Sequence, residues 1–151
     1  MQFRSIKNRG ATLIESLFAI FLVTVCAVIM ASSMPMATTA RQKADLHNRA
    51  MQVAQKEIER IRGVGYANVT ATQLYNAGIL DSATPVATNT YAFTSTESAT
   101  NNNIAAILPQ GVGYVKIEQA QTDLRRVTVW VQWTAHGTTY EYRIGTLVAN
   151  L

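Results

Sequence analysis

The feature that most constrains this 151-residue chain is an uncharged run of 25 residues, from Ser16 to Ala40. It contains the almost wholly apolar stretch LFAIFLVTVCAVIMA. A helix of 25 residues rises about 37 Å, whereas the hydrocarbon core of a bilayer is about 30 Å thick. The sequence therefore predicts a helix near the N-terminus that is long enough to cross a membrane.

Three cations, Arg4, Lys7 and Arg9, precede this run. Without them, the 13 basic and 9 acidic residues of the chain become ten basic against nine acidic, so the net charge of +4 belongs mainly to the first ten residues. Positive charge beside an apolar helix holds that end on the cytoplasmic side, which places the bulk of the chain outside. The charge gives little support to nucleic-acid binding, which needs a basic face on the folded domain. Nucleic acid stays open as a weaker partner class.

Glu15 lies at the entrance of the apolar run. An acid inside a membrane helix costs about 3 kcal/mol on insertion scales, so an intramembrane carboxylate suggests a function. The alternative is that Glu15 lies at the headgroup level and stays hydrated.

A cleaved secretory signal is the first alternative for this N-terminus. The stretch ATTA, ending at Ala40, is a candidate cleavage site, and Pro35 precedes it. However, the apolar region from Leu17 to Met34 exceeds the usual limit of about 15 residues, and Glu15 interrupts its junction with the basic segment. The sequence favours a retained helix, and a plain membrane anchor remains an alternative.

A basic leader that ends in Gly10 is followed by Ala11-Thr-Leu-Ile-Glu15 and then by the apolar helix. This arrangement resembles the class III signal of type IV pilins and type II secretion pseudopilins, which reads Gly, a small or aromatic residue, Thr, Leu, Ile, Glu. The resemblance implies that prepilin peptidase cleaves after Gly10 and methylates the amino group of Ala11. The family most often has Phe after the Gly. Ala at this place is tolerated in minor members, which weakens the case for a major pilin.

The resemblance also implies a role for Glu15 in filament assembly. Its carboxylate is expected to meet the N-terminal amine of a neighbouring subunit, an attraction that offsets desolvation of both charges in a low dielectric. The implied partners are other pilins or pseudopilins through the N-terminal helix, prepilin peptidase, and the bacterial inner membrane before assembly. The implied destination is a cell-surface or periplasmic filament, and no cofactor is expected.

Beyond Ala40 charged residues become frequent, while apolar residues recur every three or four positions, as on one face of an amphipathic helix. One helix is therefore expected from about Thr12 to Arg62, ended by Gly63 and Gly65. Pro35 lacks a backbone donor, so a kink or local melting is expected there. The apolar positions of the second half are Leu46, Ala50, Val53, Ala54, Ile58 and Ile61.

The C-terminal third predicts β-structure. The stretches VGYVKIEQ, LRRVTVWVQWTA and TTYEYRIGTLVA alternate between two faces, and His136-Gly137 marks a turn between the last two. A further short strand is expected near Thr90 to Thr94. The prediction is an antiparallel sheet of three to four strands with its apolar face on the amphipathic half of the helix. This sheet also looks like that of minor pilins of the V type and minor pseudopilins of the I type.

The expected fold is thus α+β and pilin-like, with a long N-terminal helix packed against a small antiparallel sheet. The single cysteine, Cys26, rules out an intrachain disulfide, so the exported domain depends on packing. The predicted divisions are a leader at 1–10, a transmembrane or filament-core helix half at 11–40, an amphipathic half at 41–62, and an exported domain at 63–151, with a connecting region at 63–111 and the sheet at 112–151.

Enzymatic chemistry is not expected. The chain has no Cys/His cluster with metal spacing, no nucleophile elbow and no glycine-rich phosphate loop. His47 is interpreted as a polar-face residue of the helix. Trp130, Tyr140 and Tyr142 either form an adhesive aromatic surface or, as is more usual, pack against cross-strand neighbours. The Arg125-Arg126 step is too small to argue for DNA binding.

The sequence therefore predicts a structural subunit, either a minor pilin or a minor pseudopilin, of a type IV pilus or type II secretion-like filament. Two alternatives remain. One is a major pilin of the same kind of filament, and the other is a membrane-anchored envelope binding module that does not polymerise.

Overall fold

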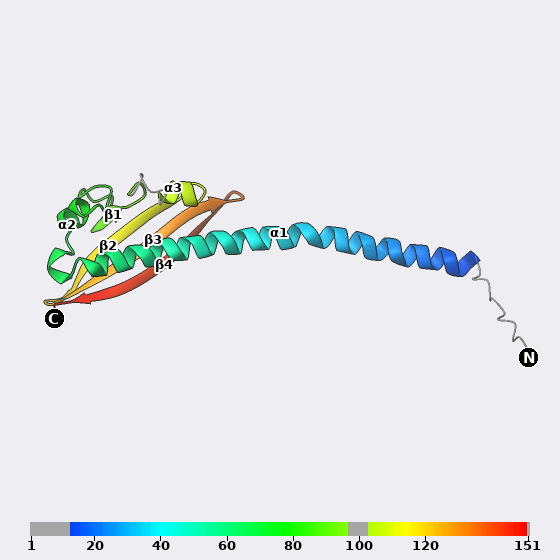
Figure 1. Ribbon diagram of the computed structural model, residues 1–151, viewed down its shortest axis with the longest axis horizontal. Coiled ribbons are helices and arrows are strands. Elements are labelled where there is room, and N and C mark those ends of the chain that lie inside the picture. The colour runs from blue at the N-terminus through cyan, green and yellow to red at the C-terminus, as the bar shows by residue number, and fades with distance from the viewer. Residues whose placement is uncertain (1–12, 97–102, 151) are drawn as a thin grey trace, which may run out of the picture. The chain divides into compact units, whose positions relative to one another are not determined.

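The computed structural model describes residues 13–96 and 103–150 and has an α+β fold with one long helix and one antiparallel sheet (Figure 1). The chain divides into two compact units, 1–42 and 43–151. Helix α1 (Leu13–Gly63) contributes residues to both units. Its observed bounds agree with the predicted helix to within a residue, apart from Thr12, which lies outside the described residues.

Helix α1 continues through Pro35 without interruption, so the expected local melting is wrong. Proline removes one helical hydrogen bond, and hydroxyl groups nearby supply others to the backbone: Ser33 donates to the Ile29 carbonyl at 2.8 Å, and Thr38 donates to the Pro35 carbonyl at 2.9 Å. Such contacts help a helix to tolerate proline. A kink at Pro35 stays a prediction.

Four strands form the sheet in the order β1-β2-β3-β4, all antiparallel. The predicted strand near Thr90 is present but short, and the three C-terminal strands match the alternating stretches. A two-residue turn at His136-Gly137 joins the last two strands, and both residues have positive φ, as a tight hairpin turn requires. The strands are β1 (Thr90–Ala92), β2 (Val112–Gln121), β3 (Leu124–Ala135) and β4 (Thr138–Ala149).

Besides the expected strand, the described part of the region between α1 and β2 contains three short helical elements that were not predicted from the sequence. Thr70 caps α2 by accepting a hydrogen bond from the Gln73 backbone, and Asn103 caps α3 in the same way from Ala105. These local side-chain bonds order segments that hydrophobic periodicity does not reveal. The elements are η1 (Tyr66–Asn68), α2 (Ala71–Asn76), β1 and α3 (Ile104–Ile107).

The core of the second unit lies between the amphipathic part of α1 and one face of the sheet, as the sequence predicts (Figure 1). Apolar residues spaced along α1 pack against the alternate residues of β3 that face it, and the connecting region closes one side. The buried helix residues are Ala50, Ala54, Ile58 and Ile61, and the buried β3 residues are Val127, Val129, Val131, Trp133 and Ala135.

Candidate functional site

The first part of α1 carries the largest apolar surface of the described chain. None of the apolar side chains between residues 13 and 36 is buried, and their exposed fractions reach 83% at Leu13. Monomeric soluble proteins rarely expose so much contiguous apolar surface. By length and composition, this helix is able to cross a membrane. The first unit therefore presents a surface that is suited to contact with lipid or with other helices.

Glu15 lies in the first turn of α1 and is the only charged residue between Leu13 and Ala40. A shallow groove beside it is lined by Ile14, Leu17, Phe18 and Phe21. The positive end of the helix dipole favours an anion in the first turn. The Glu15 side chain is exposed beside this apolar surface.

Gly10 and Ala11, the predicted processing site, lie outside the described residues. Their chemistry rests on the sequence motif. The structure adds that a helix begins by Leu13, close behind the predicted cleavage point.

Hydroxyl side chains along the apolar helix bond to its own backbone. Thr24 donates to the Ile20 carbonyl at 2.8 Å, and Thr39 donates to the Pro35 carbonyl at 3.0 Å. A hydroxyl satisfied within its own helix is compatible with an apolar environment. These hydroxyl groups are therefore satisfied within the helix itself.

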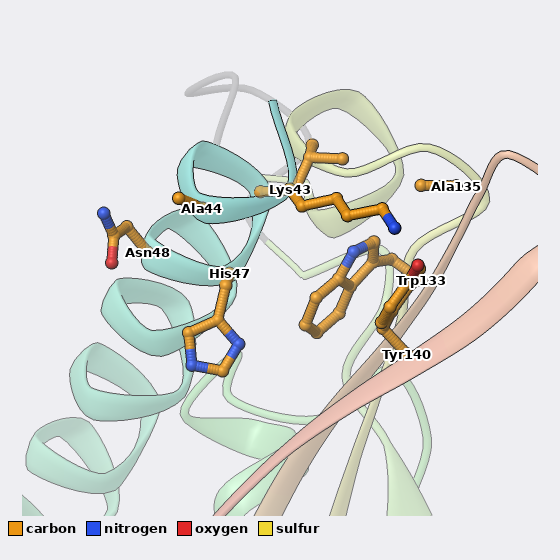
Figure 2. Close-up of a pocket in the computed structure, with 8 residues that line it drawn as sticks. Lys43, Ala44, His47, Asn48, Trp133, Ala135 and Tyr140 are labelled. Atoms are coloured by element: carbon orange, nitrogen blue, oxygen red, sulfur yellow. The ribbon is translucent and has the colours of Figure 1, made fainter. Parts of the chain in front are cut away.

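A second feature lies wholly in the 43–151 unit, where the second half of α1 faces the β3–β4 hairpin (Figure 2). The rings of Trp133 and Tyr140 stack at 5.8 Å, and the Lys43 ammonium lies 5.9 Å from the centre of the Tyr140 ring. The His47 ring approaches Trp133 edge-on at 6.1 Å and Tyr142 at 5.4 Å. His47 is exposed, as expected for a residue on the polar face of the helix, and the edge of its ring also contacts the sheet.

This aromatic pocket has a volume of about 330 Å³. The sequence-based predictions did not connect Trp133 with Lys43 or His47. Two features of the sequence could nevertheless have indicated this pocket. A two-residue turn at 136–137 places residue 133 opposite residue 140, and spacing of four brings Lys43 and His47 to one side of a helix. The lining residues are Lys43, Ala44, Leu46, His47, Asn48, Trp133, Ala135 and Tyr140.

The outer face of the sheet carries a row of one residue from each of β2, β3 and β4. Tyr114 lies 5.5 Å from Trp130, and the Arg143 guanidinium lies over the Trp130 ring at 4.8 Å. Tyr140 and Tyr142 pair in register with Trp133 and Val131, on the opposite face. Trp130 and those two tyrosines therefore do not form a single adhesive surface, because strand alternation places them on opposite faces of the sheet. The structure shows the alternative, which is packing against cross-strand neighbours.

Arg125 and Arg126 also fall on opposite faces of β3. Arg125 donates to the Val69 carbonyl and lies over the Tyr66 ring at 4.7 Å. Its charge is thus used within the domain. The two neighbouring cations form no common basic patch.

Within residues 13–96 and 103–150, no group of three or more His, Cys, Asp or Glu residues is placed to hold a metal ion. Comparison with protein-family models, curated proteins and solved structures finds no match to this chain. The geometry to be explained is therefore the exposed apolar helix with one acid and, in the other unit, the aromatic pocket.

Proposed function

We propose that this protein is a minor pilin or minor pseudopilin, a structural subunit of a type IV pilus or type II secretion-like filament. In this proposal, prepilin peptidase removes residues 1–10 and methylates Ala11, and the processed helix then packs among those of other subunits. The observation that carries the proposal is the sequence GATLIE at the start of a helix whose next 25 residues are uncharged.

The exposure of the apolar side chains of α1 supports this function. Before assembly, the inner membrane would cover them, and in the filament the helices of neighbouring subunits would do so. Both environments are apolar, so one surface serves for both. The second unit, which has its own core, is left free to face the periplasm or the cell surface.

Glu15 supports assembly over simple anchoring. A plain anchor gains nothing from an acid in its apolar segment, since the carboxylate only raises the cost of insertion. Cleavage after Gly10 creates an ammonium group four residues before Glu15 in every processed chain. Two such chains side by side supply both a carboxylate and an ammonium, so each subunit entering a filament can complete an ion pair with its neighbour.

The direct experiment on this mechanism is Glu15→Ala in a strain that assembles the filament. We expect the variant to be cleaved normally, because its cleavage point is unchanged. Its amount in the sheared filament fraction should fall at least about tenfold, because removing one partner of a buried ion pair costs about 3 to 5 kcal/mol. Immunoblots of the membrane and filament fractions give both quantities.

Glu59→Ala is the matched control, because Glu59 is an exposed acid of the same helix that pairs only with Arg62, at 3.0 Å. It should enter filaments like the parent protein. Undiminished incorporation of Glu15→Ala would assign that acid to the headgroup layer. Absence of the parent protein from every filament fraction would favour the anchored, non-polymerising module.

A further inference from the structure

Strand β4 forms one edge of the sheet, because β3 is the only strand that pairs with it (Figure 1). It pairs with β3 over Thr138–Ala149 without a register shift, and it contains no proline. Among the described residues, no hydrogen bond joins its other side to a further backbone segment. A long, regular edge strand of this kind is a template for pairing with another strand, and most proteins interrupt such edges with bulges, prolines or charges.

The turn at 136–137 determines which backbone groups of β4 face the open edge. A two-residue hairpin turn makes residues 135 and 138 a hydrogen-bonded pair, and bonded and non-bonded pairs alternate along antiparallel strands. The even-numbered residues of β4 therefore bond to β3. The odd-numbered residues, from 139 to 147, direct their N–H and C=O groups toward the open edge, where an added strand can bond to them.

The inner side chains of β4 are covered less well than those of β3. Val129 and Val131 of β3 are fully buried, whereas Ile144 and Tyr142, which lie opposite them on β4, are only half-buried. Tyr140 is half-buried in the same way. An apolar flank made of Tyr140, Tyr142 and Ile144 therefore remains partly open at the edge of the core.

The charges of β4 are arranged symmetrically about Tyr142. Glu141 and Arg143 lie on either side of it and form an ion pair at 2.8 Å. When two β4 strands pair antiparallel in a register centred on Tyr142, Glu141 of each copy lies opposite Arg143 of the other. Registers centred on Glu141 or on Arg143 place like charges opposite each other, which is destabilising. Charge complementarity therefore favours the register centred on Tyr142.

The same register matches the apolar flank. Tyr142 meets Tyr142 of the second copy, Tyr140 meets Ile144, and such aromatic and β-branched cross-strand pairs are favourable. Residues 140–144 read Tyr-Glu-Tyr-Arg-Ile, in which apolar residues alternate with first an acid and then a base. Reversed, this pattern is its own complement. The partner that fits this edge is therefore the same strand of a second copy.

We propose that β4 is a self-pairing edge, through which two copies of this chain form a dimer with twofold symmetry and one continuous sheet. The odd-numbered residues supply the backbone hydrogen bonds, and Glu141 and Arg143 of the two copies form one group of four alternating charges. A twofold contact closes after two copies, so it joins two subunits and does not extend a filament. All of these residues belong to the 43–151 unit, so the inference does not depend on the proposed function.

Two opposite charge substitutions test the pairing. Glu141→Arg leaves two cations at the centre of β4, and Arg143→Glu leaves two acids, so that either variant alone places like charges opposite each other. Each should weaken dimerisation of the full chain in detergent micelles at least about fivefold, measured by sedimentation equilibrium. An equimolar mixture of the two variants should restore dimerisation, because the cations of one copy then meet the acids of the other.

Glu118→Arg is the matched control for these variants. It makes the same change of charge as Glu141→Arg, but on β2, which lies away from the open edge. It should dimerise like the parent protein.

A disulfide tests the register. The Cα atoms of a non-hydrogen-bonded antiparallel pair lie about 4.5 Å apart, within the range that a disulfide bridges. In a chain that carries Cys26→Ala, Tyr142→Cys should therefore form a covalent dimer on oxidation, seen on a non-reducing gel. Leu147→Cys is the control, because Leu147 is 53% exposed on the same strand, but the register places its two copies about 30 Å apart. It should stay monomeric.

Three results would overturn the proposal. They are a parent chain that stays monomeric, dimerisation that neither charge variant weakens, and a mixture of the two variants that associates no better than each alone. Equal cross-linking through the two cysteine positions would also contradict it, and would assign the association to the apolar part of α1.

Discussion

At the scale of single residues, Glu15 is followed by 25 positions without a charged residue, so no basic side chain lies close behind it in the chain. The described ion pairs of Asp45, Glu59, Glu118 and Glu141 lie outside the uncharged run, with partners two to four residues away. The negative charge of each of those carboxylates is balanced by a cation nearby in the chain. The nearest basic residue before Glu15 is Arg9, which the proposed cleavage removes. In the proposed filament, the partner expected for Glu15 is the N-terminal amine of a neighbouring subunit.

The carboxylate of Glu118 shows what a local cation does. Lys116 bonds to it at 2.6 Å, and this hydrogen bond lowers the pKa of Glu118, helped by the charges of Lys116 and Arg126. Lys116→Met should raise the pKa of Glu118 back toward its ordinary value. A carboxyl-detected NMR titration measures that midpoint, and an unchanged midpoint would contradict the assignment of the hydrogen bond.

The sign of the linked stability follows from the lowered pKa. The contribution of Glu118 is fully present above its unfolded-state pKa and is lost as pH falls through the lower, folded-state pKa. In Lys116→Met, this loss of stability at low pH should be smaller. Because the Glu118 side chain is 38% exposed, salt should weaken the effect further.

At the scale of elements, β2 packs tightly against the connecting region at Gly113. A Cβ placed at Gly113 would lie 2.4 Å from Ile104 Cδ1 and 2.6 Å from Phe93 Cζ. Both side chains are buried, so neither has room to move. Gly113→Ala should lower the free energy of unfolding by about 1 to 3 kcal/mol. Denaturation of the full chain in detergent, followed by tryptophan emission, measures this loss.

Gly145→Ala is the control for that substitution, because it introduces the same methyl group into a neighbouring part of the sheet. There, the nearest atom to a new Cβ is the Val127 carbonyl oxygen at 3.6 Å, an ordinary contact. Its effect should stay within about 0.5 kcal/mol. Equal losses at the two positions would show that the close packing around Gly113 does not decide the outcome.

The elements with a long hydrophobic repeat were predictable from the sequence. Those that depend on one capping hydrogen bond were missed. The apolar spacing of α1 and the alternation of β3 each repeat over many residues, so their type and bounds were predictable. Elements α2 and α3 are six and four residues long and depend on the caps Thr70 and Asn103. Elements so short carry no period.

The candidate sites divide in the same way. Glu15 and the cleavage point are contiguous in sequence, so a motif identifies them. The aromatic pocket joins α1 to the β3–β4 hairpin, which is almost ninety residues further along the chain. Its members became neighbours only through the packing of the sheet on the helix, so no pattern within a single element identifies the pocket.

At the scale of the whole molecule, one helix serves two purposes. Its first half presents apolar side chains outward, and its second half supplies Ala50, Ala54, Ile58 and Ile61 to the core of the second unit. With Cys26 as the only cysteine, no intrachain disulfide can hold that unit. The second unit is therefore stabilised by the helix that carries the proposed assembly surface.

The central claim, that this chain is processed as a prepilin, is tested most directly by the N-terminus of the mature protein. Mass spectrometry of protein from cells that contain prepilin peptidase should show Ala11 as the first residue, with a methylated amino group. Gly10→Ala, made as the control, should keep the mass of the unprocessed chain. A first residue of Met1 or Gln2 in the parent protein, or of Arg41, would contradict the claim.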